Sequence, residues 1–215
     1  MFGRSKRKSS QAEESATPTT ETSSSAPDPE TATDTPERTT GPFDESEVDG
    51  LDGRIDLGGI WLRPVQGMEV RLEVDQATEV VSAVQVSLDD ATAQLQAFAA
   101  PRSSGIWDEI RAEIAEMIET NRGTAEESTG PFGKELLTRL PQPGPDGRTV
   151  FAPAIFVGVD GPRWFLRAVY SGRAAVDEQA RRALDAVLAG SVVVRGADPM
   201  APREMLPLHI PQGSS

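Results

Sequence analysis

The residue types best suited to binding chemistry lie in RWFLRAVYSGR, at residues 163–173. Alternate side chains of an extended strand share one face, so Arg163, Phe165 and Arg167 would lie together there. Guanidinium groups can clamp a phosphate with two hydrogen bonds, and an aromatic ring can stack on a base. Arg173 supplies a further guanidinium just beyond the strand. These four side chains form the candidate binding site for a nucleic acid or a nucleotide.

The competing interpretation of this stretch is an ordinary strand with one wetter face. Its other face is apolar and aromatic, which suits packing against helices: Trp164, Leu166, Ala168 and Tyr170. The chain has 34 acidic and 21 basic residues and a formal net charge of -13, so many carboxylates are available to pair with its arginines. Nucleic-acid sites normally lie in a basic electrostatic field. The structural interpretation is therefore preferred over the nucleic-acid site.

Nucleophilic and metal chemistry have few residues to draw on. The chain has no cysteine, which excludes disulfides, thiol nucleophiles and cysteine metal ligands. Its single histidine, His209, lies in a proline-rich segment, and no GxSxG motif accompanies it. Acidic pairs such as Glu109 with Glu113 could act as general acid and base. Carboxylates are also expected on the exposed polar face of an amphipathic helix, which accounts for them without catalysis. We therefore predict no catalytic residue, no metal site and no cofactor.

The segment GPFGKELL, residues 130–137, resembles a phosphate-binding loop only superficially. That loop requires four residues between its glycines and Ser or Thr after its lysine, because backbone amides and the hydroxyl hold phosphate and magnesium. Here two residues separate Gly130 from Gly133, and Glu135 follows Lys134. A turn that precedes a strand is the better explanation.

Composition divides the chain into a tail and a domain. Residues 1–47 combine a basic tip with an acidic stretch rich in Ser, Thr and Pro, and they cannot bury enough apolar surface to offset backbone ordering. We expect this segment to be disordered, residues 48–210 to form a single α+β domain, and residues 198–215 to form an extended proline-rich tail. The basic start precedes no apolar run, and no segment is long enough to span a membrane, which favours a cytoplasmic location.

Hydrophobic periodicity predicts the elements of the domain. Residues 67–75 alternate between apolar and charged side chains, as in a half-buried antiparallel strand. Residues 106–120 show an apolar stripe at helical spacing, and a second helix runs from about Asp177 to Gly190. Further strands are expected at residues 59–65, 79–88, 91–100, 134–141, 151–159, 163–171 and 191–195. Because the links between strands are short, the expected fold class is α+β: a largely antiparallel sheet with the two amphipathic helices packed on one face.

Local signals refine these elements. Asp89-Asp90 and Asp160-Gly161 are typical of tight turns between strands. Ser103 or Ser104 is expected to cap the first helix. Val176 is assigned to the apolar side of the second helix. The apolar stripe of the first helix consists of Ile106, Trp107, Ile110, Ile114, Met117 and Ile118.

Six segments, in order from about residue 41 to residue 210, resemble an actinobacterial family, domain-of-unknown-function family 3710 (DUF3710). They are GPFDESEVDG, GRIDLGGIWL, LQAFAAPRSSGIWDEIRAEI, GPFGKELL, VDGPRWFLRAVYSGRAA and VVVRGADPMAPREMLPL. The resemblance implies a cytoplasmic protein, and it assigns no activity and no site residues. The order of strands and helices is also similar to the Mog1/PsbP-like fold, a class of binding and assembly factors, although element order alone does not define function.

Three hypotheses about function follow from these observations. The first is a non-enzymatic protein-interaction or assembly module with a protein partner and no membrane contact. The second is a nucleic-acid or nucleotide-binding protein that uses Arg163, Phe165, Arg167 and Arg173. The third is an enzyme that uses carboxylates. The missing catalytic motifs favour the first.

Overall fold

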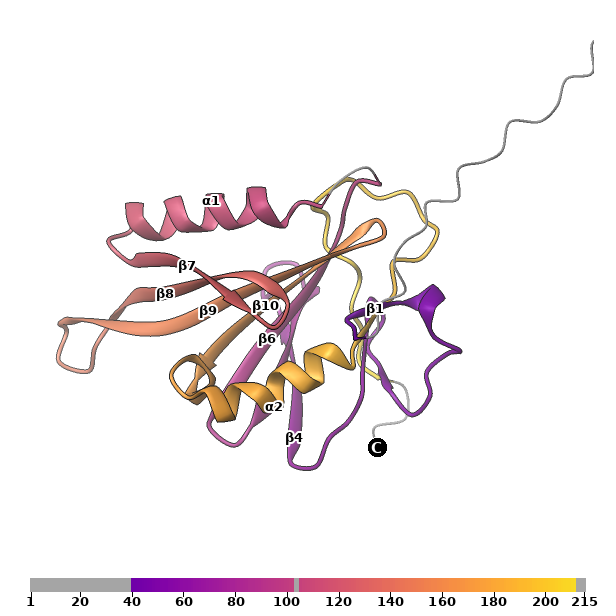
Figure 1. Ribbon diagram of the computed structural model, residues 1–215, viewed down its shortest axis with the longest axis horizontal. Helices are drawn as coiled ribbons and strands as arrows, with labels where there is room; N and C mark the ends of the chain where they lie inside the picture. Colours follow the sequence, from indigo (N-terminus) through magenta and orange to yellow (C-terminus); the bar gives the residue numbers. More distant parts are fainter. Residues whose placement is uncertain (1–39, 103–104, 212–215) are drawn as a thin grey trace, which may run out of the picture. The chain divides into compact units, whose positions relative to one another are not determined.

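The computed structural model describes residues 40–102 and 105–211, which fall in one unit of the chain. A seven-stranded sheet in the order β4-β5-β6-β10-β9-β8-β7 dominates it, and every neighbouring pair is antiparallel (Figure 1). Its strands are β4 (Met68–Val74), β5 (Val81–Leu88), β6 (Ala91–Ala99), β7 (Thr124–Gly130), β8 (Gly133–Pro143), β9 (Thr149–Gly161) and β10 (Trp164–Gly172). The mixed α+β class with a largely antiparallel sheet is confirmed.

A small second sheet gathers segments from both ends of the domain. Its order is β1-β11-β3-β2, and β1 pairs with β11 in parallel. Its strands are β1 (Phe43–Asp44), β2 (Ile55–Asp56), β3 (Ile60–Leu62) and β11 (Val192–Val193). Val192 and Val193 are fully buried, so this sheet adds to the core although each strand is short.

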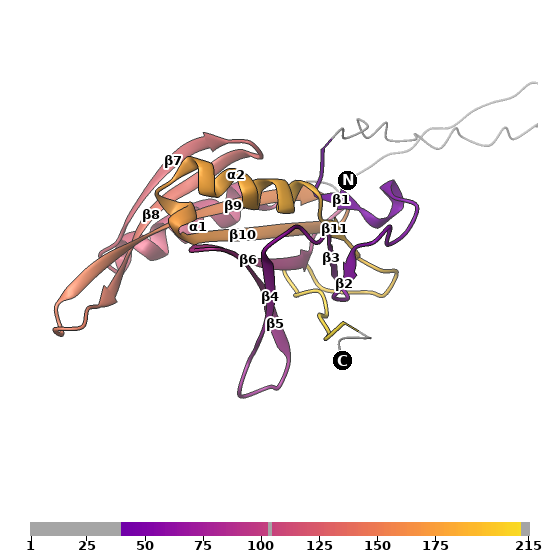
Figure 2. The ribbon, with the colours of Figure 1, turned by 90° about the horizontal axis from the view of Figure 1, so that it is seen from below.

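The two helices pack on opposite faces of the large sheet, so the prediction that both share one face is wrong (Figure 2). Helix α1 (Trp107–Thr120) covers the face that carries Phe165, and α2 (Glu178–Ala189) covers the face that carries Trp164 and Tyr170. Side chains alternate across β10, and large apolar residues occur on both of its faces. A strand that is apolar on both faces needs a covering layer on each.

The predicted strands and helices are otherwise confirmed, with three omissions (the short strands β1 and β2, and β7) and one shifted turn. The edge strand β7 was not predicted, because TAEESTG has no apolar alternation. The turn at Asp89-Asp90 is confirmed between β5 and β6. The turn expected at Asp160-Gly161 is wrong: both residues belong to β9, and the chain reverses at Pro162 and Arg163.

The start of α1 depends on Asp160 instead of a residue next to it in sequence. The Asp160 carboxylate accepts hydrogen bonds from the backbone N–H groups of Ile106 (2.8 Å) and Trp107 (3.2 Å). This satisfies two donors at the positive end of the helix dipole. The predicted caps, Ser103 and Ser104, lie outside the described residues.

Replacing Asp160 with alanine should therefore lower the free energy of unfolding by about 1 kcal/mol, the usual effect of losing a helix cap. Asp198→Ala, at an exposed position after β11, is the control and should change stability by less than about 0.5 kcal/mol. Chemical denaturation of both variants measures the difference. Equal stabilities would contradict the capping role.

Two side chains assigned to apolar helix faces are exposed instead. Met117 in α1 is 55% exposed, and Val176, just before α2, is 72% exposed. The other residues of the α1 stripe pack against the sheet. Met117 lies at the margin of the stripe, where helical periodicity alone does not fix burial.

The domain begins earlier than composition suggests. Residues 40–47 were assigned to the disordered tail, yet they contain β1 and the 3-10 helix η1 (Glu45–Glu47). Phe43 aligns with Val192 of β11, which supplies the apolar contacts that the segment cannot make alone. The remaining predicted tail, residues 1–39, lies outside the described residues.

The described part of the proline-rich C-terminal segment lies along the domain. Arg203 N–H and Leu206 N–H donate to Ala99 and Ala97 of β6, beyond the point where β5 stops pairing with that strand. Leu206 is 1% exposed, and Leu208 forms a bridge with Gly58.

Candidate functional site

The four predicted site residues do not gather at one place. Phe165 is fully buried beneath α1, where its ring stacks on Trp107 at 5.7 Å and on Phe98 at 6.1 Å between centroids. A ring with no exposed surface is not available to stack on a base. Arg173 lies in the 3-10 helix η2 (Arg173–Ala175) and forms an ion pair with Asp177 at 2.8 Å. It lines a different cavity from those lined by the other three residues.

Arg167 lies in a groove between α1 and strands β6 and β10. The groove has a volume of about 270 Å³. Its lining is mostly apolar, and its charged residues are Glu113, Arg167 and Arg203. The lining residues are Phe98, Ile110, Glu113, Ile114, Met117, Phe165, Arg167 and Arg203.

The surroundings of Arg167 satisfy its charge poorly. Its guanidinium carbon lies 5.5 Å from the centre of the Phe98 ring, and one N–H donates to Gln96 Oε1. Its Nε is buried without a hydrogen-bond partner, and it forms no ion pair within the described part of the chain. Burial lowers the pKa of Arg167, although an arginine remains charged at neutral pH.

Arg203 lines the same groove and is fully paired. Its guanidinium contacts the carboxylates of Glu109 and Glu113, each at 3.0 Å. Hydrogen bonds and charge from these two acids raise the pKa of Arg203. The acidic pair proposed for acid–base work therefore joins the C-terminal segment to α1.

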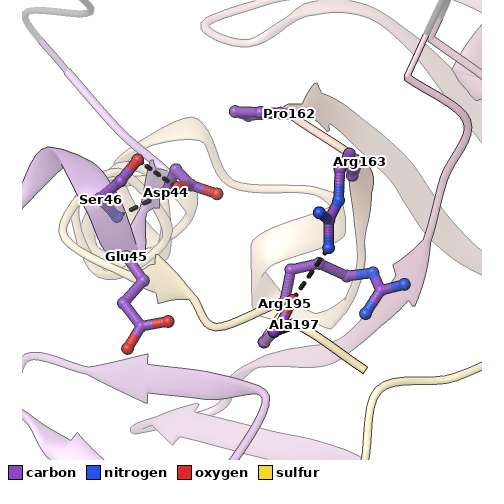
Figure 3. A pocket seen from close by; sticks show the side chains of 8 residues that line it. Asp44, Glu45, Ser46, Pro162, Arg163, Arg195 and Ala197 are labelled. Carbon is purple, nitrogen blue, oxygen red and sulfur yellow. Dashed lines mark hydrogen bonds between the residues drawn. The ribbon is translucent and has the colours of Figure 1, made fainter. Parts of the chain in front are cut away.

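Arg163 lines a different cavity, which has a volume of about 520 Å³ and lies at the β9–β10 turn (Figure 3). Arg195, from the segment after β11, shares this cavity with it. Figure 3 shows the two arginines on one side of the cavity and Asp44, Glu45 and Ser46 on the other. The predicted strand face is thus divided between two places, because Arg163 belongs to the turn and not to the strand.

A buried ionic cluster beneath α2 is the remaining place where carboxylates meet. Arg181 of α2 forms two hydrogen bonds with Glu135 of β8, and its Nε lies 3.6 Å from Asp185 Oδ2. Tyr170 donates its hydroxyl to Asp185 Oδ1 at 2.8 Å. Burial raises the pKa values of Tyr170 and Asp185. None of the four lines a cavity described above, so the cluster has no visible access for a substrate.

Metal ligation and membrane insertion find no support in the part of the chain that the structure describes. Over residues 40–102 and 105–211, no three acidic or histidine side chains gather as a metal site would require. His209 Nε2 lies 3.8 Å from Asp56, and its side chain is half exposed. No helix in these same ranges combines the length and the apolar character needed to cross a membrane.

Most lining residues of the two cavities were missed from the sequence, among them Phe98, Met117, Arg195 and Arg203. Met117 had been assigned to the core. Phe98 of β6 lies opposite Phe165 of β10. The sequence of one strand does not determine its register with the next, so this pairing was not predictable. Arg195 and Arg203 come from the C-terminal segment, where no periodic pattern predicts what they contact.

These features define an α+β domain with one helix on each face of an antiparallel sheet and with arginines in several of its surface cavities. The family model described as "Protein of unknown function (DUF3710)" matches residues 41–215, and the chain belongs to this family. The resemblance inferred from six sequence segments is thereby confirmed. No curated protein and no solved structure matches the chain. The similarity to the Mog1/PsbP-like fold stays a prediction.

Proposed function

We propose that this protein is a cytoplasmic, non-enzymatic interaction module that docks a segment of a partner protein in the groove beside α1. The observation that carries this proposal is Arg167: a guanidinium without an acidic partner in the described ranges, in an apolar groove. A charge that is partly removed from water and unpaired is costly, and a carboxylate from a ligand would complete it. The partner segment accordingly places an apolar side chain in the groove and an Asp or Glu side chain on Arg167.

The groove has the composition of a docking surface. Met117 is 55% exposed although it adjoins Ile110 and Ile114, so it offers a flexible apolar contact at the surface. Hot spots in protein interfaces are small, apolar at the centre and often centred on an arginine. The volume of about 270 Å³ suits one large side chain of a partner better than a whole cofactor.

The alternative is nucleic-acid or nucleotide binding through Arg163, Phe165, Arg167 and Arg173. Phe165 would first have to leave its buried contacts with Phe98 and Trp107. Glu113 also lines the groove, and Glu109 shares with it the ion pair to Arg203, so carboxylates near the groove oppose a phosphate backbone. These observations support a protein segment over a nucleic acid at this groove.

A selection from a library of random 12-residue peptides tests the proposal. We expect the enriched peptides to combine an apolar residue with Asp or Glu, and to bind the full chain saturably. Met117→Asp adds a negative charge to the groove, and Arg167→Met removes the positive one while keeping the length of the side chain. Each change should weaken peptide binding by about tenfold or more, measured by fluorescence polarisation.

Val80→Asp is the matched control, because Val80 is 56% exposed and lies at the β4–β5 turn, away from the groove. It introduces the same charge at the same exposure and should leave peptide affinity unchanged. Peptides that bind Met117→Asp as well as the unchanged chain would show that the groove is not the docking site. If the enriched peptides lacked acidic residues, Arg167 would not be the group that pairs with a carboxylate of the partner.

A further inference from the structure

The cavity shared by Arg163 and Arg195 is built from three segments that are far apart in sequence: residues 44–46, 162–163 and 195–197 (Figure 3). Its own lining residues hold these segments together. Trp164 Nε1 donates to Asp44 Oδ2 at 2.7 Å, which joins the first segment to β10. Arg163 donates to the carbonyl oxygen of Gly196 at 2.9 Å, which joins the second to the third. The cavity is therefore preformed.

Both arginines retain donors that nothing in the described residues satisfies. Neither forms an ion pair within these ranges. Each donates one hydrogen bond to a backbone carbonyl, Arg163 to Gly196 and Arg195 to Asp198. Arg195 Nε is buried without a partner. A guanidinium has five N–H donors, so the same wall of the cavity presents several unused donors and two positive charges.

The turn conformation of Arg163 places its side chain at the cavity. Arg163 has a φ of 64°, in the left-handed region where glycine is the favoured residue. An arginine in this conformation costs free energy that a glycine would not. The turn nevertheless carries arginine, and this conformation brings its guanidinium to the cavity (Figure 3).

The opposite wall is acidic, and hydrogen bonds hold the Asp44 carboxylate in place. Asp44 accepts hydrogen bonds from Ser46 N–H and Ser46 Oγ in addition to Trp164 Nε1. Glu45 is exposed and can accept hydrogen bonds from hydroxyl groups. The cavity thus has a cationic wall suited to an oxyanion and a facing wall suited to hydroxyl donors.

We propose that this cavity binds a small phosphomonoester that carries hydroxyl groups, such as a sugar phosphate. Arg163 and Arg195 hold the phosphate, because the planar fork of a guanidinium matches phosphate oxygens. Glu45 and Ser46 accept hydrogen bonds from the hydroxyl groups of the ligand. The volume of about 520 Å³ lies within the range of small-molecule sites and exceeds what a phosphate group alone would fill. This site is separate from the groove beside α1 and does not depend on the proposed docking function.

Isothermal titration calorimetry of the full chain with glucose 6-phosphate, ribose 5-phosphate and inorganic phosphate tests this site. We expect saturable binding of at least one sugar phosphate, about tenfold tighter than that of inorganic phosphate. Arg163→Gly and Arg195→Met should each weaken it by about tenfold or more. Arg163→Gly also relieves the left-handed backbone, so the variant should unfold at a temperature no lower than the unchanged chain.

Arg122→Gly is the matched control. Arg122 also has a left-handed backbone, with a φ of 65°, and it lies between α1 and β7, away from the cavity. The Arg122→Gly variant loses the same charge at the same kind of backbone position, and it should bind the sugar phosphate as tightly as the unchanged chain does. The proposal is overturned if neither sugar phosphate binds saturably, or if Arg163→Gly and Arg122→Gly bind it equally. Sugar phosphates that bind no more tightly than inorganic phosphate would overturn the role of the hydroxyl groups.

Discussion

Replacing Arg181 with methionine is expected to lower the free energy of unfolding by about 3–5 kcal/mol at neutral pH. Arg181 joins Glu135, whose side chain is 4% exposed, and Asp185, whose side chain is 13% exposed. Methionine keeps an apolar stem of similar length but removes the charge. Two carboxylates would then stay buried without a cation, which costs much more than the ion pair contributes. Urea denaturation followed by circular dichroism measures the loss.

The destabilisation should depend on pH in one direction. Burial raises the pKa of Asp185 above its ordinary value of 3.8, and the charge of Arg181 opposes that rise. Without Arg181 the pKa in the folded state rises further above that of the unfolded chain. The penalty is therefore fully present above the folded-state pKa and disappears as Asp185 takes up a proton. The stability difference should shrink between about pH 7 and pH 4.

Arg182→Met is the control for Arg181→Met. Arg182 is the next residue along α2, and it pairs with Glu178 at the surface, where the two side chains are 71% and 79% exposed. Exposed pairs of this kind contribute about 0.5 kcal/mol or less, so the control should unfold almost like the unchanged chain. Similar losses in the two variants would show that the buried cluster does not stabilise the domain.

Gly158→Ala should destabilise the domain by about 1–3 kcal/mol, because it forces an atom into a filled space. A Cβ at this position of β9 would lie 2.2 Å from the ring of Trp107. The indole cannot move freely, because its Nε1 donates to the carbonyl oxygen of Lys134 at 2.7 Å. The substitution should therefore lift the start of α1 from the sheet. Denaturation with urea measures the stability, and tryptophan fluorescence should report the displaced indole.

Gly190→Ala separates this steric effect from the general effect of replacing glycine. Gly190 has an ordinary helical backbone, with a φ of -88°, and an added Cβ would approach no atom closer than 3.4 Å. Alanine should be neutral there or stabilise slightly, by up to about 1 kcal/mol, because it restricts the unfolded chain. If Gly158→Ala were as stable as Gly190→Ala, the contact with Trp107 would not limit that position.

The sequence was informative wherever one element shows its own periodicity. The alternation in β4 and the stripe of α1 predict these elements without knowledge of their neighbours. The face that each helix covers was not predictable, because β10 carries Phe165 on one face and Trp164 on the other. β7 escaped prediction because its stability comes from pairing with β8 and not from its own composition.

The candidate site was predictable only in part, and for a similar reason. Arg163, Phe165 and Arg167 do alternate in sequence, but a single residue of register moves Arg163 from the strand into the turn. The sequence also cannot show that α1 covers Phe165, nor that Arg195 approaches Arg163 from a segment 32 residues later in the numbering. Both cavities form where segments that are far apart in the sequence pack together.

The parallel pairing of β1 with β11 has a consequence for the order in which the chain folds. The pairing joins residues 43–44 to residues 192–193, near opposite ends of the domain. During synthesis, β1 must wait for its partner until residues 192–193 have been made. Contacts between such remote segments form slowly, since the intervening chain must first be ordered. We therefore expect the large sheet to assemble first and β1 to join the small sheet only after β11 is in place.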